Sequence, residues 1–374
     1  MPAKKSTRAQ KAAKAKKAGE PLATYRAKRD FEITPEPSPE VQLPESDHPR
    51  FVVQEHHATA LHWDFRLERD GVLPSWAVPK GIPPDPKVNH LAVQTEDHPL
   101  SYIDFAGEIP KGEYGGGTVK VWDQGWYELE KWDAREVKFT LHGERVQGRY
   151  VLIKTRGKQW LMHRMDPPQD PTREPFPSGL RPMLAKKGTL PKDDGDFGFE
   201  IAWGGRRVLI YVEGGRIEVD DADGTNVSDR YPELTRLGRA VGSTEVVLDG
   251  ELVALDDNDQ PQPGVPPDRQ DLESDSALRR AARDHPVAVM LFDILYCDGH
   301  MTTDLPYTER RKHLEALKLS GANWQTPSFH KGDGAALVRA AGGQGLPGVV
   351  AKRLDSGYAA GKRSGDWVLV AADR

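Results

Sequence analysis

The sequence contains very little cysteine and no long apolar run, and each absence excludes a class of protein. Cys297 is the single cysteine of the 374 residues, so no disulfide forms within the chain, which is typical of a reducing compartment. No stretch approaches the roughly 20 apolar residues that a membrane-spanning helix needs, and the N-terminus lacks the apolar core of a signal peptide. These absences predict a soluble cytoplasmic protein with no membrane segment.

The sequence also lacks a large net charge, which is only −5. A charge of that size does not by itself indicate a nucleic-acid-binding protein, but the basic residues are unevenly distributed. Residues 1–28 form a basic arm that is rich in Ala and Lys. Such an arm is either a disordered, solvated extension or a phosphate-binding segment whose affinity falls steeply with salt, and the sequence leaves both readings open.

Proline-rich segments divide the rest of the chain into two predicted domains, which suits its length. In residues 29–166, short strand-forming runs separated by Gly and Asp turns predict an all-β domain. Residues 167–180 are predicted to be a proline-rich linker. Residues 181–374 mix helical stretches such as 308–319 with apolar strands such as 287–295, which predicts the α+β class.

The most informative local pattern lies at residues 61–67, where apolar residues alternate with His62, Asp64 and Arg66. A strand would place these three polar side chains on one face. With His56 a few residues upstream, the pattern indicates a two-histidine, one-carboxylate metal site beside an anion-binding arginine, as in metal-assisted phosphoester cleavage. An ordinary strand with a solvated polar face has the same alternation.

Further polar residues at strand ends favour phosphoryl chemistry. Gln54 follows the apolar run 51–53, Lys80 ends a strand at a Pro/Gly turn, and Glu96 and His98 lie in a carboxylate-rich turn. Imidazoles, carboxylates and cations are the groups that a phosphoryl site uses.

Residues 29–166 resemble the 3′-phosphoesterase domain of bacterial DNA ligase D, the end-joining repair enzyme. The resemblance rests on the Gln54–Arg66 core and on the motifs Trp76–Gly81, Glu96–Leu100, Ile109–Gly117 and Val121–Asp123. It covers almost the whole segment, and the combination is specific although no single motif is. The resemblance implies a small β-barrel that prefers Mn²⁺.

By this resemblance, the metal ligands are His56, His62 and Asp64. The residues expected at the phosphate are Arg66, Lys80, His98 and Tyr102, with Gln54 and Glu96 in support and Arg29, Asp30 and Glu36 contributing from the N-terminal side.

Individual roles follow from the chemistry of these side chains. Arg66 is expected to bind phosphate oxygens in a bidentate manner and Lys80 as a point charge. His98, with an ordinary pKa near neutrality, is the candidate for proton transfer or transition-state hydrogen bonding. His90 stands where the family usually has Arg, which weakens one expected phosphate contact and could favour one of the domain's activities over another.

Residues 181–374 resemble the adenylation domain of ATP-dependent DNA ligases, as found in ligase D. The matching motifs are Arg181–Ala185, Leu248–Leu252, Leu291–Leu295 and Gly348–Arg353, in the family's order and spacing. Arg207, Glu251 and Lys352 survive and could bind nucleotide weakly, bind the DNA backbone, or belong to a fold kept for docking to a partner.

The catalytic part of the ligase resemblance is interrupted at several points. Ala202 stands where a ligase has the lysine that forms lysyl-AMP, and a methyl group cannot attack a phosphate. Other departures are Gly204 for an Asp, Asp221–Ala222 for a Ser-Arg pair, Pro347 for a Glu, and Trp367–Ala371 without its two lysines. The chain stops at Arg374 without an OB domain, so an inactive ligase domain that does not use ATP is expected.

These observations lead to the hypothesis of a Mn²⁺-dependent hydrolase that heals DNA 3′ ends in bacterial non-homologous end joining. It would remove 3′-terminal ribonucleotides and 3′-phosphates from primer-templates at the nucleoid, leaving 3′-OH ends for a polymerase or ligase in trans, with Ku as a candidate partner. The alternative is a non-catalytic scaffold that binds DNA ends, for which His90 is the visible sign of an eroded site. An active ligase is a third reading, against which Ala202 argues.

Overall fold

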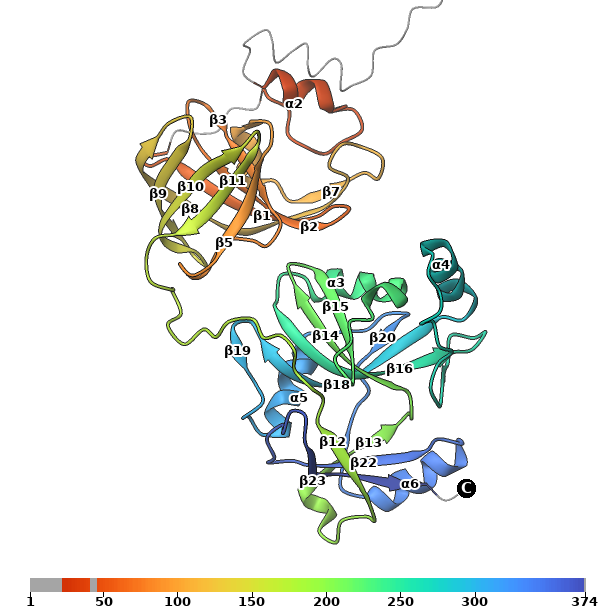
Figure 1. Cartoon of the computed structure of the whole chain (residues 1–374). Helices are drawn as coiled ribbons and strands as arrows, with labels where there is room; N and C mark the ends of the chain where they lie inside the picture. The colour runs from red at the N-terminus through yellow and green to blue at the C-terminus, as the bar shows by residue number, and fades with distance from the viewer. Residues whose placement is uncertain (1–21, 41–45, 373–374) are drawn as a thin grey trace, which may run out of the picture. The chain divides into compact units, whose positions relative to one another are not determined.

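The computed structural model describes residues 22–40 and 46–372, and the chain divides between Pro171 and Thr172 into two compact units (Figure 1). None of the helices in these ranges is long and apolar enough to cross a membrane. The basic residues 1–21 lie outside the described residues, so the two readings of that part of the arm stay predictions.

The first unit is a closed antiparallel barrel, as the family resemblance predicted. Its strands pair in the order β1, β2, β4, β5, β11, β10, β9, β8, and β8 pairs again with β1 to close the cylinder. The bounds are β1 (Arg50–His57), β2 (Leu61–Leu67), β4 (Ser75–Val78), β5 (Asn89–Gln94), β8 (Gly117–Trp132), β9 (Glu136–Gly143), β10 (Gln147–Arg156) and β11 (Gln159–Arg164). Outside the cylinder, β7 (Gly107–Ile109) pairs with β8, and β3 (Val72–Leu73) pairs with β6 (His98–Pro99), which leads into the 3-10 helix η1 (Leu100–Asp104).

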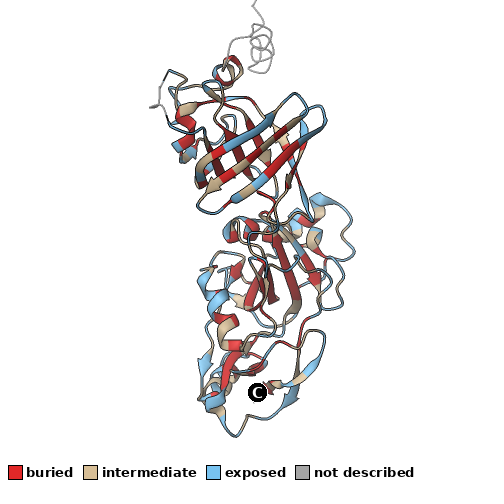
Figure 2. Ribbon diagram, turned by 90° about the vertical axis from the view of Figure 1, so that its left-hand side faces the viewer, coloured by how far each residue is buried: buried red, intermediate tan, exposed pale blue. Residues whose placement is uncertain are grey.

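The alternation in β2 divides its side chains between two cores. Trp63 and Phe65 belong to the barrel's apolar core, together with Trp76 and Phe139. Figure 2 shows buried and more exposed segments along the strands of the barrel. The opposite face of β1 and β2 lies outside the cylinder, and a second apolar cluster that includes Tyr25, Val52, Tyr102, Phe105 and Ile109 covers part of it. The polar face is therefore not solvated: Asp64 is 6% exposed and Arg66 is 2% exposed, which excludes the ordinary solvated strand.

The N-terminal segment forms part of this cover. Residues Ala23–Lys28 form the short helix α2, in which Tyr25 is fully buried and donates a hydrogen bond to the carbonyl of Pro37 at 2.7 Å. The prediction that residues 1–28 lie in an arm outside the domain therefore needs correction from residue 22 onward. Burial of one aromatic ring gives even so short a helix the tertiary contact that its own propensity could not supply.

The second unit contains two sheets and several helices. One sheet has the order β12 (Leu184–Gly188), β23 (Arg363–Ala371), β22 (Gly348–Arg353), β13 (Phe197–Ala202), β21 (His330–Lys331). The other has the order β15 (Arg216–Asp221), β14 (Arg206–Glu213), β16 (Val246–Leu255), β18 (Val287–Cys297), β19 (His300–Met301), and β17 (Pro261–Gln262) and β20 (Trp324–Gln325) pair with β16 and β18. The helices are α3 (Thr235–Val241), α4 (Asp275–Asp284), α5 (Tyr307–Ala316) and α6 (Gly334–Gly343).

The predicted linker 167–180 is shorter than the sequence indicated. Residues from Thr172 belong to the second unit: Arg173 forms an ion pair with Glu245, and the ring of Phe176 packs against that of Tyr296 at 5.2 Å. The prolines of this segment therefore do not indicate a free linker alone, because residues from Thr172 onward pack against the second unit.

A buried ion pair joins two of the elements of the second unit, and its loss should be measurable. Asp293 of β18 and Arg310 of α5 are both 0% exposed and meet through two hydrogen bonds, at 2.8 and 3.0 Å. We predict that Asp293→Asn lowers the free energy of unfolding of this unit by about 3–5 kcal/mol, because the guanidinium of Arg310 stays buried without its counterion. Differential scanning calorimetry measures this, and Asp293→Asn combined with Arg310→Met should recover part of the loss. A change below about 1 kcal/mol would contradict the prediction.

Candidate metal and phosphate site

Strand register brings the predicted metal ligands together. In the antiparallel pairing of β1 with β2, His56 lies opposite His62 and Gln54 lies opposite Asp64. Because side chains alternate with a period of two, these residues share the outer face of the two strands. One ligand atom from each of His56, His62 and Asp64 lies within 4.8 Å of the others.

Backbone carbonyl groups orient both imidazole rings. The Nε2 atom of His56 lies 2.8 Å from the carbonyl oxygen of Gly115, and the Nδ1 atom of His62 lies 3.0 Å from that of Ala60. A carbonyl only accepts, so each of these nitrogens carries the ring proton and donates it. The other nitrogens, Nδ1 of His56 and Nε2 of His62, face Asp64, at 3.3 and 3.7 Å, and are the ones that an ion between the three side chains would contact. This is the arrangement in which an outer hydrogen bond fixes the tautomer of a metal-binding histidine.

Asp64 is held as a carboxylate. Burial disfavours its charge, but Arg66 and the two histidines more than offset this and lower the pKa of Asp64 well below its ordinary value. A charged carboxylate and two neutral imidazoles are ligands that suit a divalent ion of intermediate softness such as Mn²⁺. The donor set therefore fits the metal that the family resemblance implies.

Arg66 is the centre of the hydrogen-bond network. Its guanidinium donates to Gln54 at 2.7 Å, Ser75 at 2.9 Å and Asp64 at 2.9 Å. A terminal nitrogen also lies 2.8 Å from the Nδ1 atom of His98, but that atom lies 2.9 Å from the carbonyl oxygen of Glu96, which can only accept. Three of the five N–H groups of Arg66 are therefore used to position its neighbours, and the bidentate phosphate contact stays a prediction.

Gln54 supports the network from beneath. Its side chain is fully buried, accepts from Arg66, and donates to the backbone carbonyls of Tyr102 and Phe105 at 3.0 and 2.8 Å. These bonds tie η1 to β1, so Gln54 acts on the site through its neighbours.

The N-terminal segment supplies a second guanidinium. Arg29 donates to Glu36 at 2.8 Å and to Glu96 at 3.1 Å, and its Nη2 atom lies 3.2 Å from His98. One N–H on each terminal nitrogen remains without a partner among the described residues, so Arg29 is better placed than Arg66 to bind two phosphate oxygens. Lys28 also binds Glu96, at 2.8 Å, and although burial opposes it, these cations lower the pKa of Glu96.

His98 differs electrostatically from the sequence-based expectation. Burial, then the nearby charges of Arg66 and Arg29, lower the pKa of His98 well below its ordinary value. The ring is therefore neutral, and the argument from a near-neutral pKa for proton transfer does not apply to it. Tyr102 packs edge-on against this ring at 4.8 Å and donates its O–H to Glu36 at 2.8 Å.

Three other predicted residues lie outside this cavity. Lys80 is exposed in the turn after β4 and does not line the cavity, and neither does Asp30. His90 is buried and its Nδ1 atom lies 2.8 Å from the carbonyl of Gly81. His90 therefore contacts the turn that carries Lys80, and the exchange of Arg for His leaves the cavity wall intact.

The cavity itself measures about 260 Å³ and is lined by the metal-ligand cluster and by Arg29, Glu36, Arg66, Glu96, His98 and Tyr102, among others. Its two guanidinium groups face three carboxylates, and Lys28 pairs with one of these, Glu96, so with neutral histidines the charges balance. A divalent cation at His56, His62 and Asp64 would make the cavity positive and attract an anionic phosphate.

Sequence reasoning missed several residues that shape the site. Tyr25 packs against His98 at 5.2 Å and under the guanidinium of Arg29 at 3.8 Å, Ser75 accepts from Arg66, and Gly115 accepts from His56. A lone aromatic residue in an Ala/Lys-rich arm was the available signal for Tyr25. Gly115 acts through its backbone oxygen and Ser75 through a small hydroxyl group, and a pattern of side chains in the sequence predicts neither contact.

The second unit has a separate cavity of about 210 Å³, which gathers Arg207, Glu251 and Lys352 with Ala202. Two of its three cations are already paired, and the third, Arg363, donates to the carbonyl of Ala185. Arg207 binds Asp249 through two hydrogen bonds, at 2.5 and 2.6 Å, and the Nζ atom of Lys352 lies 2.6 Å from Glu200. Burial lowers the pKa of Lys352 and raises that of Glu251. A lysine thus does line the cavity near Ala202, although none stands nearby in the sequence, and its ammonium group is held by a carboxylate.

Comparison with known proteins agrees with both units. Residues 54–154 match the model of the DNA ligase D 3′-phosphoesterase domain, and residues 182–370 match that of the ATP dependent DNA ligase domain. The multifunctional non-homologous end joining proteins LigD of Mycobacterium tuberculosis, Mycolicibacterium smegmatis and Pseudomonas aeruginosa are 43%, 42% and 37% identical over 93% of this chain. The alignments cover 44%, 45% and 46% of those proteins, so the chain spans about half their length.

Metal binding can be tested apart from activity. We predict that the chain binds Mn²⁺ in isothermal titration calorimetry and that His62→Ala weakens binding by about 100-fold or more, since even outer partners of metal ligands are worth roughly 10–100-fold. His57→Ala is the matched control, because His57 neighbours His56 but binds Glu55 at 2.5 Å and is not part of the cluster. If His62→Ala binds Mn²⁺ as tightly as the parent does, the assignment of the metal site to His56, His62 and Asp64 is wrong.

Proposed function

Because the chain belongs to the ligase D family and carries a 3′-phosphoesterase domain followed by an ATP-dependent ligase domain, we propose that its barrel is a Mn²⁺-dependent phosphoesterase that heals DNA 3′ ends. The observation that carries the proposal is the cluster of His56, His62 and Asp64, in which a carbonyl group holds each imidazole through one ring nitrogen and the other ring nitrogen faces Asp64, with two guanidinium groups beside it. Such a cluster offers two ring nitrogens and a carboxylate oxygen to a metal ion.

The residues of the cavity divide the work. His56, His62 and Asp64 hold the ion, which when bound supplies Lewis-acid polarisation of phosphate oxygens and acidifies a coordinated water. Arg29 binds the phosphate oxygens with its two remaining N–H groups, and Arg66 adds one more donor while fixing Asp64 and His98. Glu36, Gln54 and Tyr102 are positioning residues that keep the two guanidinium groups in place.

The proposed substrates are DNA primer-templates whose 3′ end is blocked by a ribonucleotide or by a phosphate. Both present a phosphate group bonded to the 3′ oxygen of the strand, so one cavity can serve both. The product is a 3′-OH end for a polymerase or ligase acting in trans during non-homologous end joining, and Ku is a candidate partner through the end-joining role that the names of the relatives state.

We further propose that the ligase domain forms no lysyl-AMP and does not use ATP. Ala202 offers no nucleophile, and Lys352, which lines the same cavity, is bound to Glu200 and lies 4.2 Å from the ring centres of both Phe292 and Trp367. The Oε2 atom of Glu251 lines this cavity and has no hydrogen-bond partner among the described residues. It could therefore accept a hydrogen bond from a weakly bound ligand that carries a hydroxyl group.

The alternative of a non-catalytic scaffold receives no support from His90. His90 does not line the cavity, and its ring contacts the Gly81 carbonyl. This departure from the pattern of the phosphoesterase domain therefore leaves the cavity intact.

The proposal predicts metal-dependent product on two 5′-labelled primer-templates, one ending in a ribonucleotide and one in a 3′-phosphate. With Mn²⁺ both should be converted, and with EDTA neither. His62→Ala should reduce both conversions to background while His57→Ala stays within about two-fold of the parent. Conversion by His62→Ala at the rate of the parent would refute the site, and absence of product from the parent, with DNA still bound, would favour the scaffold.

Adenylation is tested with α-labelled ATP and Mg²⁺. We predict no labelled protein, because neither Ala202 nor the paired Lys352 can attack the α-phosphate. Label that survives denaturation but is absent from Lys352→Ala would contradict this and identify Lys352 as the nucleophile.

A further inference from the structure

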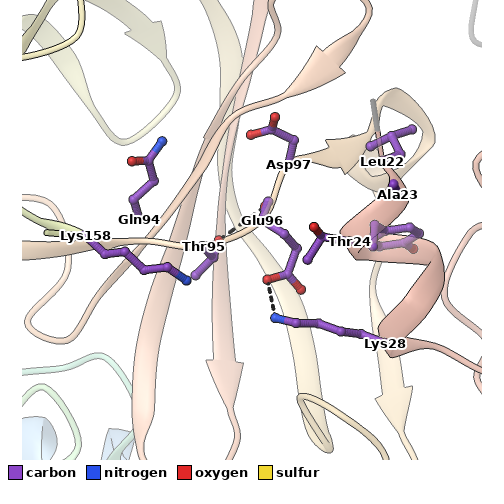
Figure 3. Close-up of a pocket in the computed structure, with 10 residues that line it drawn as sticks. Leu22, Ala23, Thr24, Lys28, Gln94, Thr95, Glu96, Asp97 and Lys158 are labelled. Carbon is purple, nitrogen blue, oxygen red and sulfur yellow. Dashed lines mark hydrogen bonds and ion pairs between the residues drawn. The ribbon is translucent and has the colours of Figure 1, made fainter. Parts of the chain in front are cut away.

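A second cavity adjoins the metal cavity in the first unit. It measures about 280 Å³ and lies between helix α2 and the segment that leads from β5 to β6 (Figure 3). The two cavities have Thr95 and Glu96 in common, so this segment is a wall of both. Glu96 belongs to the network of the metal cavity, and the far side of this wall faces the second cavity.

The wall is braced from the helix side. Lys28 of α2 binds Glu96 at 2.8 Å, and Figure 3 shows Lys28 and Lys158 reaching toward Thr95 and Glu96 from opposite sides. Lys158 belongs to the turn between β10 and β11, and its backbone carbonyl accepts a hydrogen bond from the amide of Gln94 at 2.8 Å. The second cavity is thus bounded by helix α2, by the turn between β10 and β11, and by residues 94–97, to which both of the others are hydrogen-bonded.

We infer that this cavity is the subsite for the terminal nucleoside of a strand whose last phosphodiester lies in the metal cavity. The inference rests on the proposed phosphoesterase function and adds to it the place of the group that is removed. The group that is removed is a single nucleoside, so its subsite needs room for only one sugar and one base.

The size of the cavity fits one nucleoside. Its volume of about 280 Å³ is near the lower end of the roughly 300–1,000 Å³ typical of small-ligand pockets. It has room for one sugar and one base and is too small for a longer piece of a strand.

The lining chemistry also fits. Asp97, Gln94 and the hydroxyl of Thr24 offer hydrogen-bond acceptors to ribose hydroxyl groups, and Lys158 offers donors to a base edge or a sugar oxygen. Leu22 and Ala23 provide an apolar side for the face of a base. Carboxylate recognition of ribose hydroxyls is a common solution in nucleotide sites.

The two proposed substrates use this cavity differently, which makes the inference testable. In a ribonucleotide-terminated strand, the reacting phosphate carries a nucleoside that would enter the second cavity. A strand that ends in a 3′-phosphate has no such nucleoside, so the second cavity would stay unused. A change confined to the second cavity should therefore affect one reaction and spare the other.

The experiment compares kcat/KM for both substrates, with Mn²⁺, in the parent and in two variants from different walls. Thr24→Phe fills the cavity, and Asp97→Asn weakens an acceptor without changing volume. We expect each to lower removal of the terminal ribonucleoside, by about 10-fold or more for Thr24→Phe, and to leave removal of the 3′-phosphate within about two-fold. Arg26→Phe is the matched control, because it adds an aromatic ring to the exposed side of the same helix and should change neither reaction.

The outcomes separate this inference from the function on which it rests. An equal loss of both reactions in the two variants, or no loss in either reaction, would overturn the nucleoside subsite while the parent still acts on both substrates. If Thr24→Phe fails to fold, Asp97→Asn decides alone. A parent that is inactive on both substrates would overturn the phosphoesterase function itself.

Discussion

The buried guanidinium of Arg66 is the constraint on which the first unit's site depends. A cation that is 2% exposed must be surrounded by acceptors, and its hydrogen bonds select the positions of Asp64, Gln54, Ser75 and His98. The same charge keeps Asp64 ionised and helps to keep His98 neutral. Arg66 therefore helps to hold the proposed metal ligand Asp64 on the barrel's outer face, and this uses much of its own capacity to bind substrate.

The two units treat their buried charges in opposite ways. In the barrel, one ring nitrogen of His56 and one of His62 face a space shared with Asp64, and the surrounding cations, Lys28 among them, only balance the carboxylates. In the second unit, Lys352 is bound to Glu200 and Arg207 to Asp249, and buried pairs of this kind satisfy each other. The third cation of that lining, Arg363, donates to the carbonyl of Ala185. The physical contrast is that the first cavity gathers ligand atoms that an ion could bind, and the second holds two of its cations in ion pairs.

Short-range patterns such as alternation in a strand located the all-β domain, the boundary region and the cluster of His56, His62 and Asp64, and the family resemblance supplied the barrel. Sequence reasoning failed where the outcome depended on tertiary packing. Nothing local to Arg66 showed that most of its N–H groups would face partners within the protein, or that burial would make His98 neutral. Helix α2 was placed in an arm outside the domain because the ring of Tyr25 packs against His98 and Tyr102, which lie far along the chain. Lys80 was placed at the phosphate by resemblance, and its turn leaves it exposed.

The most direct test of the account is to locate the metal. Crystals of the chain soaked in Mn²⁺ should give a peak in anomalous difference density, measured at the manganese absorption edge, bonded to Nδ1 of His56, Nε2 of His62 and a carboxylate oxygen of Asp64. The same ring nitrogens should keep their hydrogen bonds to Gly115 and Ala60 on the other side. A fully occupied peak elsewhere in the barrel, or none at these three residues at saturating Mn²⁺, would contradict the account.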